Sequence, residues 1–323
     1  MRTLDEITVV VPDVPDGGEW GEAEDEAEPA EVPLIRVQRL LAGLLAEARP
    51  PEEFPRPMLI AWLMLWTRVF QGLEGLRGAA VRRSLYSARV ISRTLFETNV
   101  QVRAIARNLT DTSSRLPEAL KRRSVEDRLH AYLAWSIHQD LDAWRHFLRA
   151  RNLDAVFDPK PARDFARKYG HVVPALGALV EEYETLTDAE ARAEREEAKS
   201  VADQKIEEYS SWLQDERLLP FSERLNREEH RSFYSFLDPN EKSVRGALDA
   251  DGVPYAYGIY ARGSAVAHGT TCEGLMSRIG PAFAPQVWAT DDSIASAVGQ
   301  GLRSARNTTF GLFLIRPRYL LGG

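Results

Sequence analysis

The feature that most constrains the fold is a long stretch in which small and apolar side chains recur at every third or fourth position. Over about Ala79 to Asn108 this stripe consists of Val81, Leu85, Ala88, Ser92, Leu95, Asn99, Val102 and Ala106. Such spacing places all of its members on one face of an α-helix. It therefore predicts a long helix with one face in a hydrophobic core.

Similar periodicity, bounded by prolines and capping residues, predicts further helices before and after this one. No alternation of strands with helices is evident, which excludes a parallel sheet. We therefore expect an all-α fold, a multi-helix bundle with long antiparallel helices. The prediction is one helical domain over 33–323, with core helices at about 56–152 and 254–316 and a strongly charged helical segment at about 186–217.

The net charge of −7 is unevenly distributed along the chain. Residues 1–32 hold eleven acidic residues and one arginine, a charge of 1 − 11 = −10, so the rest carries −7 − (−10) = +3. Acidic segments of this composition are typically solvated and disordered. We expect a disordered acidic N-terminal arm over 1–32; the alternative is that it shields a basic surface of the body.

Composition also bounds the compartment and the cofactors. The single cysteine, Cys272, excludes an internal disulfide and a cysteine-rich metal site, as is typical of a reducing cytosol. The most apolar segment, Met58–Trp66, has only about half the length that a membrane span needs. We expect a cytoplasmic protein with no membrane association, no cofactor and no bound metal.

The stretch from Tyr257 to His268 holds the main candidate site. Its sequence predicts a helix that opens at Pro254 and ends at Gly269, a favoured residue beyond a helix end. Ser264 and His268 lie one turn apart, within hydrogen-bonding reach, and the carbonyl end of the helix favours a protonated imidazole. His268 is either a general acid or base, or a structural residue that ties two helices together.

Arg262 precedes His268 by six residues. A metal-free ribonuclease needs a base, an acid and a cation for the phosphate, which one histidine and one arginine per subunit can supply if two subunits combine them. Six residues place the two side chains about 120° apart on a helix, so they meet one phosphate only across an interface or at a distorted helix end. This interpretation predicts a homo-oligomer, in the simplest case a homodimer.

A second group lies on the long helix. Arg93 and Glu97 are four residues apart and can form an ion pair, with Arg89 one turn earlier. In a functional interpretation Glu97 faces inward and orients His268 or a tyrosine. In the alternative the pair is exposed and contributes under about 1 kcal/mol. Asn99, inside the apolar stripe, indicates that this helix buries polar groups.

These residues carry a resemblance. Arg93-Thr-Leu-Phe-Glu97, followed by Tyr257, Tyr260 and Ser264-x-x-x-His268, resembles an uncharacterised bacterial helical family, domain of unknown function 5677, over about residues 60–270. That family implies no assigned activity. Arg262 and His268 also resemble the Arg-x(4–6)-His motif of the HEPN nucleotide-binding and ribonuclease superfamily. In that motif a polar residue follows the arginine, whereas this chain has Gly263.

Three functions follow. The first is a HEPN-like RNA-cleaving or RNA-binding effector, of the kind found in bacterial toxin or phage-defence systems, with RNA as the partner. Its site would comprise His268, Arg262, Ser264 and Glu97, and its binding residues Arg93, Tyr257, Tyr260 and Arg89. The second is a non-enzymatic binding or scaffold module in which the same residues form a structural network. The third is a metal-dependent oxidase using Glu97, Asp127 and His130, although the chain lacks a second Glu-x-x-His unit.

Overall fold

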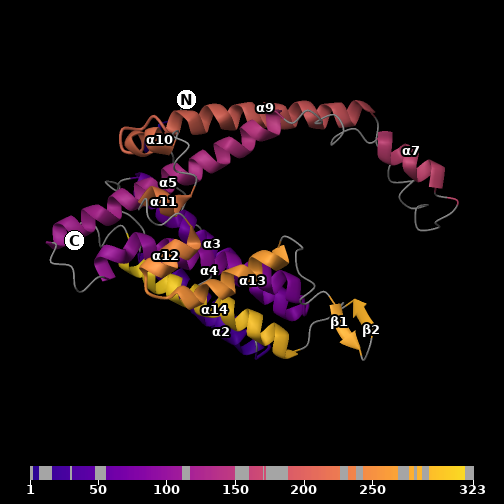
Figure 1. Ribbon diagram of the computed structural model, residues 1–323, viewed down its shortest axis with the longest axis horizontal. Helices are drawn as coiled ribbons and strands as arrows, with labels where there is room; N and C mark the ends of the chain where they lie inside the picture. Colours follow the sequence, from indigo (N-terminus) through magenta and orange to yellow (C-terminus); the bar gives the residue numbers. More distant parts are fainter. Residues whose placement is uncertain are drawn as a thin grey trace. The chain divides into compact units, whose positions relative to one another are not determined.

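A computed structural model gives the fold of the chain (Figure 1). The residues that it describes are 3–6, 17–29, 31–47, 56–110, 117–149, 160–169, 171, 188–225, 232–237, 243–267, 276–279, 282–285 and 291–316. Within these ranges the secondary structure is helical, apart from the antiparallel hairpin of β1 (Met276–Ile279) and β2 (Ala282–Pro285), in which Met276 pairs with Pro285. The predicted all-α fold is confirmed.

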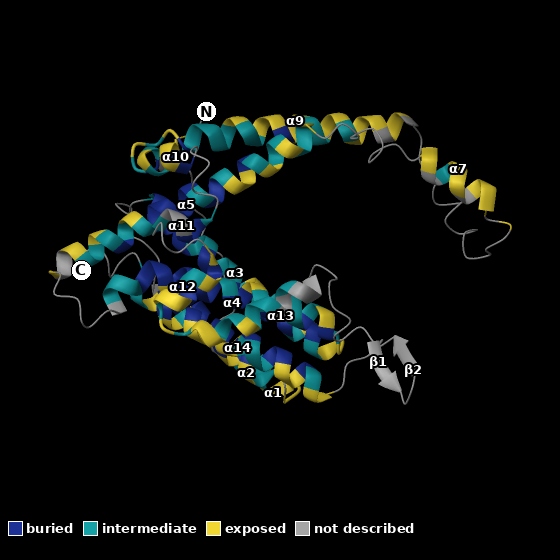
Figure 2. Cartoon of the chain, viewed as in Figure 1, coloured by how far each residue is buried: buried dark blue, intermediate teal, exposed yellow. Residues whose placement is uncertain are grey.

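The chain forms two compact units instead of the single expected domain. One consists of residues 1–3 and 134–222, the other of residues 4–133 and 223–323. Helix α5 (Glu118–Arg149) contributes its first half to the larger unit and its second half to the smaller one. The smaller unit also contains α7 (Lys160–Tyr169) and α9 (Asp188–Trp212), and most residues in the first two-thirds of α9 are exposed (Figure 2). Helix α9 is the predicted charged helix.

The core of the larger unit is built by α3 (Arg56–Val81), α4 (Leu85–Thr110) and α14 (Asp291–Leu314). Helix α14 packs so closely that a Cβ atom at Gly301 would lie 2.6 Å from Leu76 Cδ1 and 2.7 Å from Ser92 Oγ. Ser92 Oγ donates a hydrogen bond of 2.7 Å to the Ala297 carbonyl oxygen. The buried Trp62 donates from Nε1 to the Leu312 carbonyl oxygen at 3.0 Å. These contacts fix α14 against both partner helices.

Helix α2 (Val32–Glu47) packs on α3 and α14, and α1 (Gly17–Glu26) packs on α2. Trp20 of α1 is buried, its ring at 77° and 6.4 Å from that of Phe70. Ile35 joins the same cluster. The expectation of a disordered arm is therefore wrong for residues 17–26, because burial of one large indole stabilises a short acidic helix.

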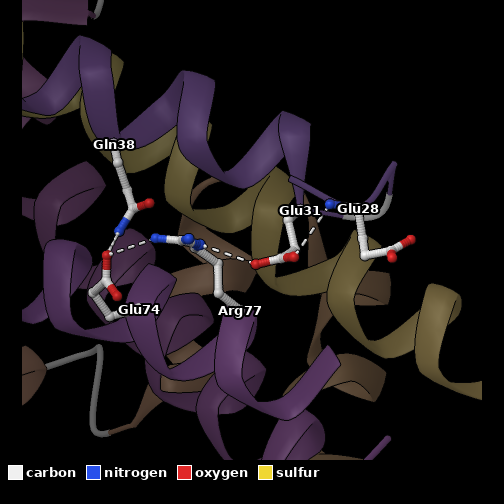
Figure 3. Close-up of polar contacts among 5 residues, drawn as sticks. All are labelled: Glu28, Glu31, Gln38, Glu74 and Arg77. Atoms are coloured by element: carbon white, nitrogen blue, oxygen red, sulfur yellow. Dashed lines mark hydrogen bonds and ion pairs between the residues drawn. The ribbon is translucent and has the colours of Figure 1, made fainter. Parts of the chain in front are cut away.

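Polar side chains also join α2 to α3 (Figure 3). The buried Gln38 donates from Nε2 to the carboxylate of Glu74, and Arg77 donates to the same carboxylate oxygen at 3.3 Å. Arg77 Nε also reaches Glu31 Oε1 at 3.4 Å. Glu31 Oε2 in turn accepts a backbone hydrogen bond from Glu28 at 3.4 Å. These polar contacts continue from the buried Gln38 to exposed residues and add to the apolar packing between the two helices.

The helix predicted over Ala79–Asn108 is not continuous, because its first residues belong to the preceding helix α3. Residues up to Val81 belong to α3, residues 82–84 form a turn, and α4 begins at Leu85. Arg83 adopts a left-handed conformation with φ of 52°, which ends α3, and its guanidinium forms an ion pair with Asp291. Val81 is consequently 63% exposed. The remaining members of the predicted stripe are buried, as expected.

Three short helices lead to the last part of the larger unit. They are α11 (Phe233–Leu237), α12 (Val244–Ala250) and the 3-10 helix η2 (Pro254–Ala256), followed directly by α13 (Tyr257–Ala267). A fourth short helix, α10 (Leu219–Leu225), precedes them at the boundary between the units, and η1 (Leu4–Glu6) lies near the N-terminus. Helix α13 packs on α4. This contact brings together the two segments that hold the predicted site.

Candidate functional site

Helix α4 supplies one half of the candidate site. Its buried stripe faces α3 and α14, and its arginines lie outside that stripe because they occupy other positions of the helical repeat. Arg89 and Arg93 are partly buried one turn apart, on the part of the helix that precedes Asn99. The fold thus holds cationic side chains at the edge of a rigid apolar core.

Arg93 and Tyr260 join α4 to α13. A terminal nitrogen of the Arg93 guanidinium donates to the Tyr260 hydroxyl at 3.2 Å, and the guanidinium carbon lies 4.9 Å from the centre of the tyrosine ring. Glu97 accompanies Arg93 at 4.0 Å, the long end of an ion pair. The Arg93 side chain is 21% exposed, and its Nε atom is buried with no hydrogen-bond partner among the described residues. The geometry is that of a cation–π contact supported by a carboxylate.

The contact extends along α13 toward its start. The rings of Tyr257 and Tyr260 lie 5.7 Å apart at 36°, and the Arg245 guanidinium carbon of α12 is 5.9 Å from the centre of the Tyr257 ring. The four side chains therefore follow one another in the order Arg245, Tyr257, Tyr260, Arg93, with the two tyrosines between the two arginines. We call these four residues the Arg–Tyr face. Tyr255, just before them in η2, is 82% exposed.

The structure brings together four of the predicted site residues, Arg93, Glu97, Tyr257 and Tyr260, and their role as a functional site stays a prediction. Glu97 lies 4.0 Å from Arg93, and the expectation that it orients His268 or a tyrosine stays a prediction. Ser264 lies in α13 as predicted and is partly buried. Arg262 also lies in α13, but its side chain is outside the described part of the structure, and so is His268. The pairing of Arg262 with His268 stays a prediction.

Asp251 is a residue that the sequence did not single out. Its carboxylate, only 8% exposed, accepts hydrogen bonds from Arg103 Nε at 3.0 Å and Arg107 Nε at 3.1 Å. Asp251 ends α12, and Gly252 follows it with φ of 70°. The Asp251-Gly252 pair is a turn signal that could have drawn attention to this position. The ion pairs fix the end of α12, the helix that carries Arg245, on α4.

The residues named for the metal alternative are arranged differently. Asp127 is exposed, whereas His130 is only 5% exposed and is surrounded by the core. Across the ranges that the structure describes, no three His, Cys, Asp or Glu side chains are grouped as a metal ion would require. In the same ranges, no helix combines the length and the apolar character needed to cross a bilayer.

Comparison with protein-family models, with curated proteins and with solved structures found no significant match to this chain. The resemblance to the bacterial helical family and to the HEPN superfamily therefore stays a prediction.

Proposed function

We propose that the protein binds single-stranded RNA through the Arg–Tyr face, as an RNA-binding or RNA-cleaving effector. The observation that carries the proposal is the Arg93 guanidinium held over the Tyr260 ring. Proteins that bind single strands combine cations for the phosphates with aromatic rings on which bases stack. The Arg–Tyr face contains both groups, because Tyr257 and Tyr260 lie between Arg245 and Arg93.

Charge and exposure support the same proposal. The face contains two arginines, and the Glu97 carboxylate lies 4.0 Å from one of them, Arg93. The Glu97 side chain is 35% exposed, so water screens its charge. A contact of this length therefore neutralises Arg93 incompletely. Base stacking on a tyrosine contributes about 1–3 kcal/mol per base to the free energy of binding. This exceeds the free energy that such an exposed ion pair contributes.

Cleavage is the catalytic form of the proposal. His268 would act as the general acid or base and Arg262 as the phosphate clamp, with Ser264 in support. Because six residues correspond to about 120° of rotation on a regular helix, two subunits would have to contribute to one site. A toxin or defence role would follow from RNA cleavage. Loss of cleavage in His268→Ala, with RNA binding retained, is the expected outcome.

The binding test is fluorescence anisotropy with a labelled single-stranded RNA. We expect Arg93→Gln and Tyr260→Leu each to weaken binding by about tenfold, since each removes one phosphate or stacking contact. Arg93→Gln should also lower the slope of log K against log salt by about 0.7. Arg303→Gln on α14 and Tyr169→Leu on α7 are matched controls, because both residues are exposed and lie outside the face. Unchanged affinity in Arg93→Gln and Tyr260→Leu would contradict the proposal.

A second function has its own observation. The hydrogen bond from Arg93 to Tyr260 links α4 to α13, so the same group could serve only to hold the two helices in register, as in a scaffold module. Tyr260→Phe separates the two functions, because it removes the hydrogen bond and keeps the ring. A scaffold predicts a loss of about 1 kcal/mol in the free energy of unfolding. An RNA-binding face predicts that RNA affinity depends on the ring and survives this change.

A further inference from the structure

A cavity of about 600 Å³ lies between α4 and α14, apart from the Arg–Tyr face. Helix α4 contributes Asn99, Arg103 and Arg107 to its wall, and Asp251 closes one side. The residues from α14 are Arg306, Asn307, Phe310, Gly311 and Leu314. Pockets for small molecules typically measure about 300–1,000 Å³. The cavity therefore has room for a compound of moderate size.

Asn99 is a buried polar residue of this wall. Its side chain is 6% exposed, and its amide nitrogen Nδ2 is buried without a hydrogen-bond partner among the described residues. A buried donor that stays unpaired costs about 1–3 kcal/mol. Because Asn99 borders the cavity, a bound molecule whose oxygen or nitrogen acceptor reached this amide would supply the missing partner.

The charge of the wall favours an anion. Three arginines face one carboxylate, a balance of 3 − 1 = +2. Asp251 is occupied by Arg103 and Arg107. Arg306 is exposed and forms no ion pair with any residue in the described ranges. Its guanidinium is therefore the group available to a ligand at the mouth of the cavity.

The rest of the wall is apolar. Phe310 is 65% exposed although its ring borders the cavity, and Ala106 and Leu314 lie beside it. Rings stack favourably on an aromatic face of this kind. From these three properties we infer that the cavity binds a small aromatic anion that also carries a hydrogen-bond acceptor. Arg306 would hold its negative group, Phe310 its ring, and Asn99 its acceptor.

The test uses 6-methoxy-2-naphthoate, a fluorescent compound with a carboxylate, an aromatic ring system and an ether oxygen. Two companions each lack one feature: 2-methoxynaphthalene has no carboxylate and 2-naphthoate has no ether oxygen. We expect the full-length protein to bind the first compound and to bind each companion about tenfold more weakly, the loss typical of one charged or buried hydrogen bond.

Variants assign the binding to this cavity. Arg306→Gln should weaken binding of 6-methoxy-2-naphthoate about tenfold, whereas Arg303→Gln, its neighbour one turn earlier on α14, should leave it unchanged. Asn99→Leu keeps the branched shape of the side chain and removes the donor. It should weaken binding of the methoxy compound about tenfold without changing binding of 2-naphthoate, and a thermal melt checks that it folds.

Three results would overturn the inference. They are no binding of 6-methoxy-2-naphthoate below about 10 mM, equal binding of the uncharged companion, or unchanged binding in both Arg306→Gln and Asn99→Leu. These outcomes are independent of the RNA proposal, because neither variant alters a residue of the Arg–Tyr face. If RNA binding fails while 6-methoxy-2-naphthoate still binds, only the RNA proposal is contradicted. If the naphthoate fails to bind while RNA still binds, only the inference about the cavity is contradicted.

Discussion

The two sides of α4 have opposite physical character. Toward α14 the helices approach so closely that Gly301 and Gly311 leave no room for a Cβ atom, and Ser92 is sealed by a hydrogen bond to a carbonyl oxygen. Toward α13 the contact is made by a partly exposed arginine and tyrosine. The same helix therefore uses one side for stability and leaves charged and aromatic groups accessible on the other. Substitutions on the first side should affect folding, and those on the second should affect binding.

The largest effect should come from Trp62→Ala on the buried side. Trp62 is fully buried and donates a hydrogen bond to the Leu312 carbonyl oxygen. Truncation leaves a large cavity and should lower the free energy of unfolding by about 3–5 kcal/mol, measured by urea denaturation. Trp62→Phe is the control, because it keeps most of the volume and should lose clearly less. Equal losses in both variants would show that the indole nitrogen, and not the packed volume, dominates.

Gly301→Val tests the close approach of α14. The new side chain would meet Leu76 and Ser92, so we expect a loss of about 1–3 kcal/mol in the free energy of unfolding. Gly299→Ala on the same helix is the matched control, since its nearest side-chain atom is 3.9 Å away. That change should stabilise the protein by up to about 1 kcal/mol through helix propensity. A neutral Gly301→Val would mean that the packing of α14 on α4 is looser than described.

Asp251→Asn should lower the free energy of unfolding by less than Gly301→Val does. It removes the charge that Arg103 and Arg107 share, but both guanidinium groups keep access to water. We expect a loss of about 1–2 kcal/mol, measured by thermal unfolding. Asp249→Asn, an exposed residue of the same helix, should be neutral. If both variants behave alike, the ion pairs do not hold α12 on α4.

The smallest expected effect concerns Glu126 of α5. Burial and the neighbouring Asp127 carboxylate raise the pKa of Glu126 above its ordinary value of 4.5, against an opposing effect of Arg123. Because the folded pKa is the higher one, ionised Glu126 destabilises the protein above that pKa, and the penalty fades as the pH falls through it. Glu126→Gln should therefore raise the melting temperature at pH 7 and have little effect at about pH 4. The exposed Glu223→Gln should show no such pH dependence.

Most of the fold could be predicted because the helices that form the core carry strong apolar periodicity. The buried stripe of α4, the start of α14 at Asp291 and the opening of α13 after Pro254 all follow from local sequence. The turn at Arg83 could not, because no glycine or proline marks it and the left-handed residue is fixed by tertiary contacts. Helix α1 could not be predicted either, because its acidic composition is typical of a disordered segment and gives no sign that Trp20 is buried.

The candidate site was predictable only in part. The motif residues Arg93, Glu97, Tyr257 and Tyr260 do lie together, and helical spacing identified the first pair. Arg245, Asp251 and Arg306 reach their positions through the packing of α12 and α14 on α4, which no local pattern encodes. Sequence reasoning thus found groups on α4 and α13 and missed those that α12, the residue after it and α14 bring to α4.

The central claim is that the Arg–Tyr face binds RNA and does not merely join two helices. Its most direct test measures RNA affinity and the free energy of unfolding in parallel for Arg93→Gln. We predict that affinity falls about tenfold while the free energy of unfolding changes by less than about 1 kcal/mol. Unchanged RNA affinity together with a clear loss of stability would contradict it and assign the contact to architecture.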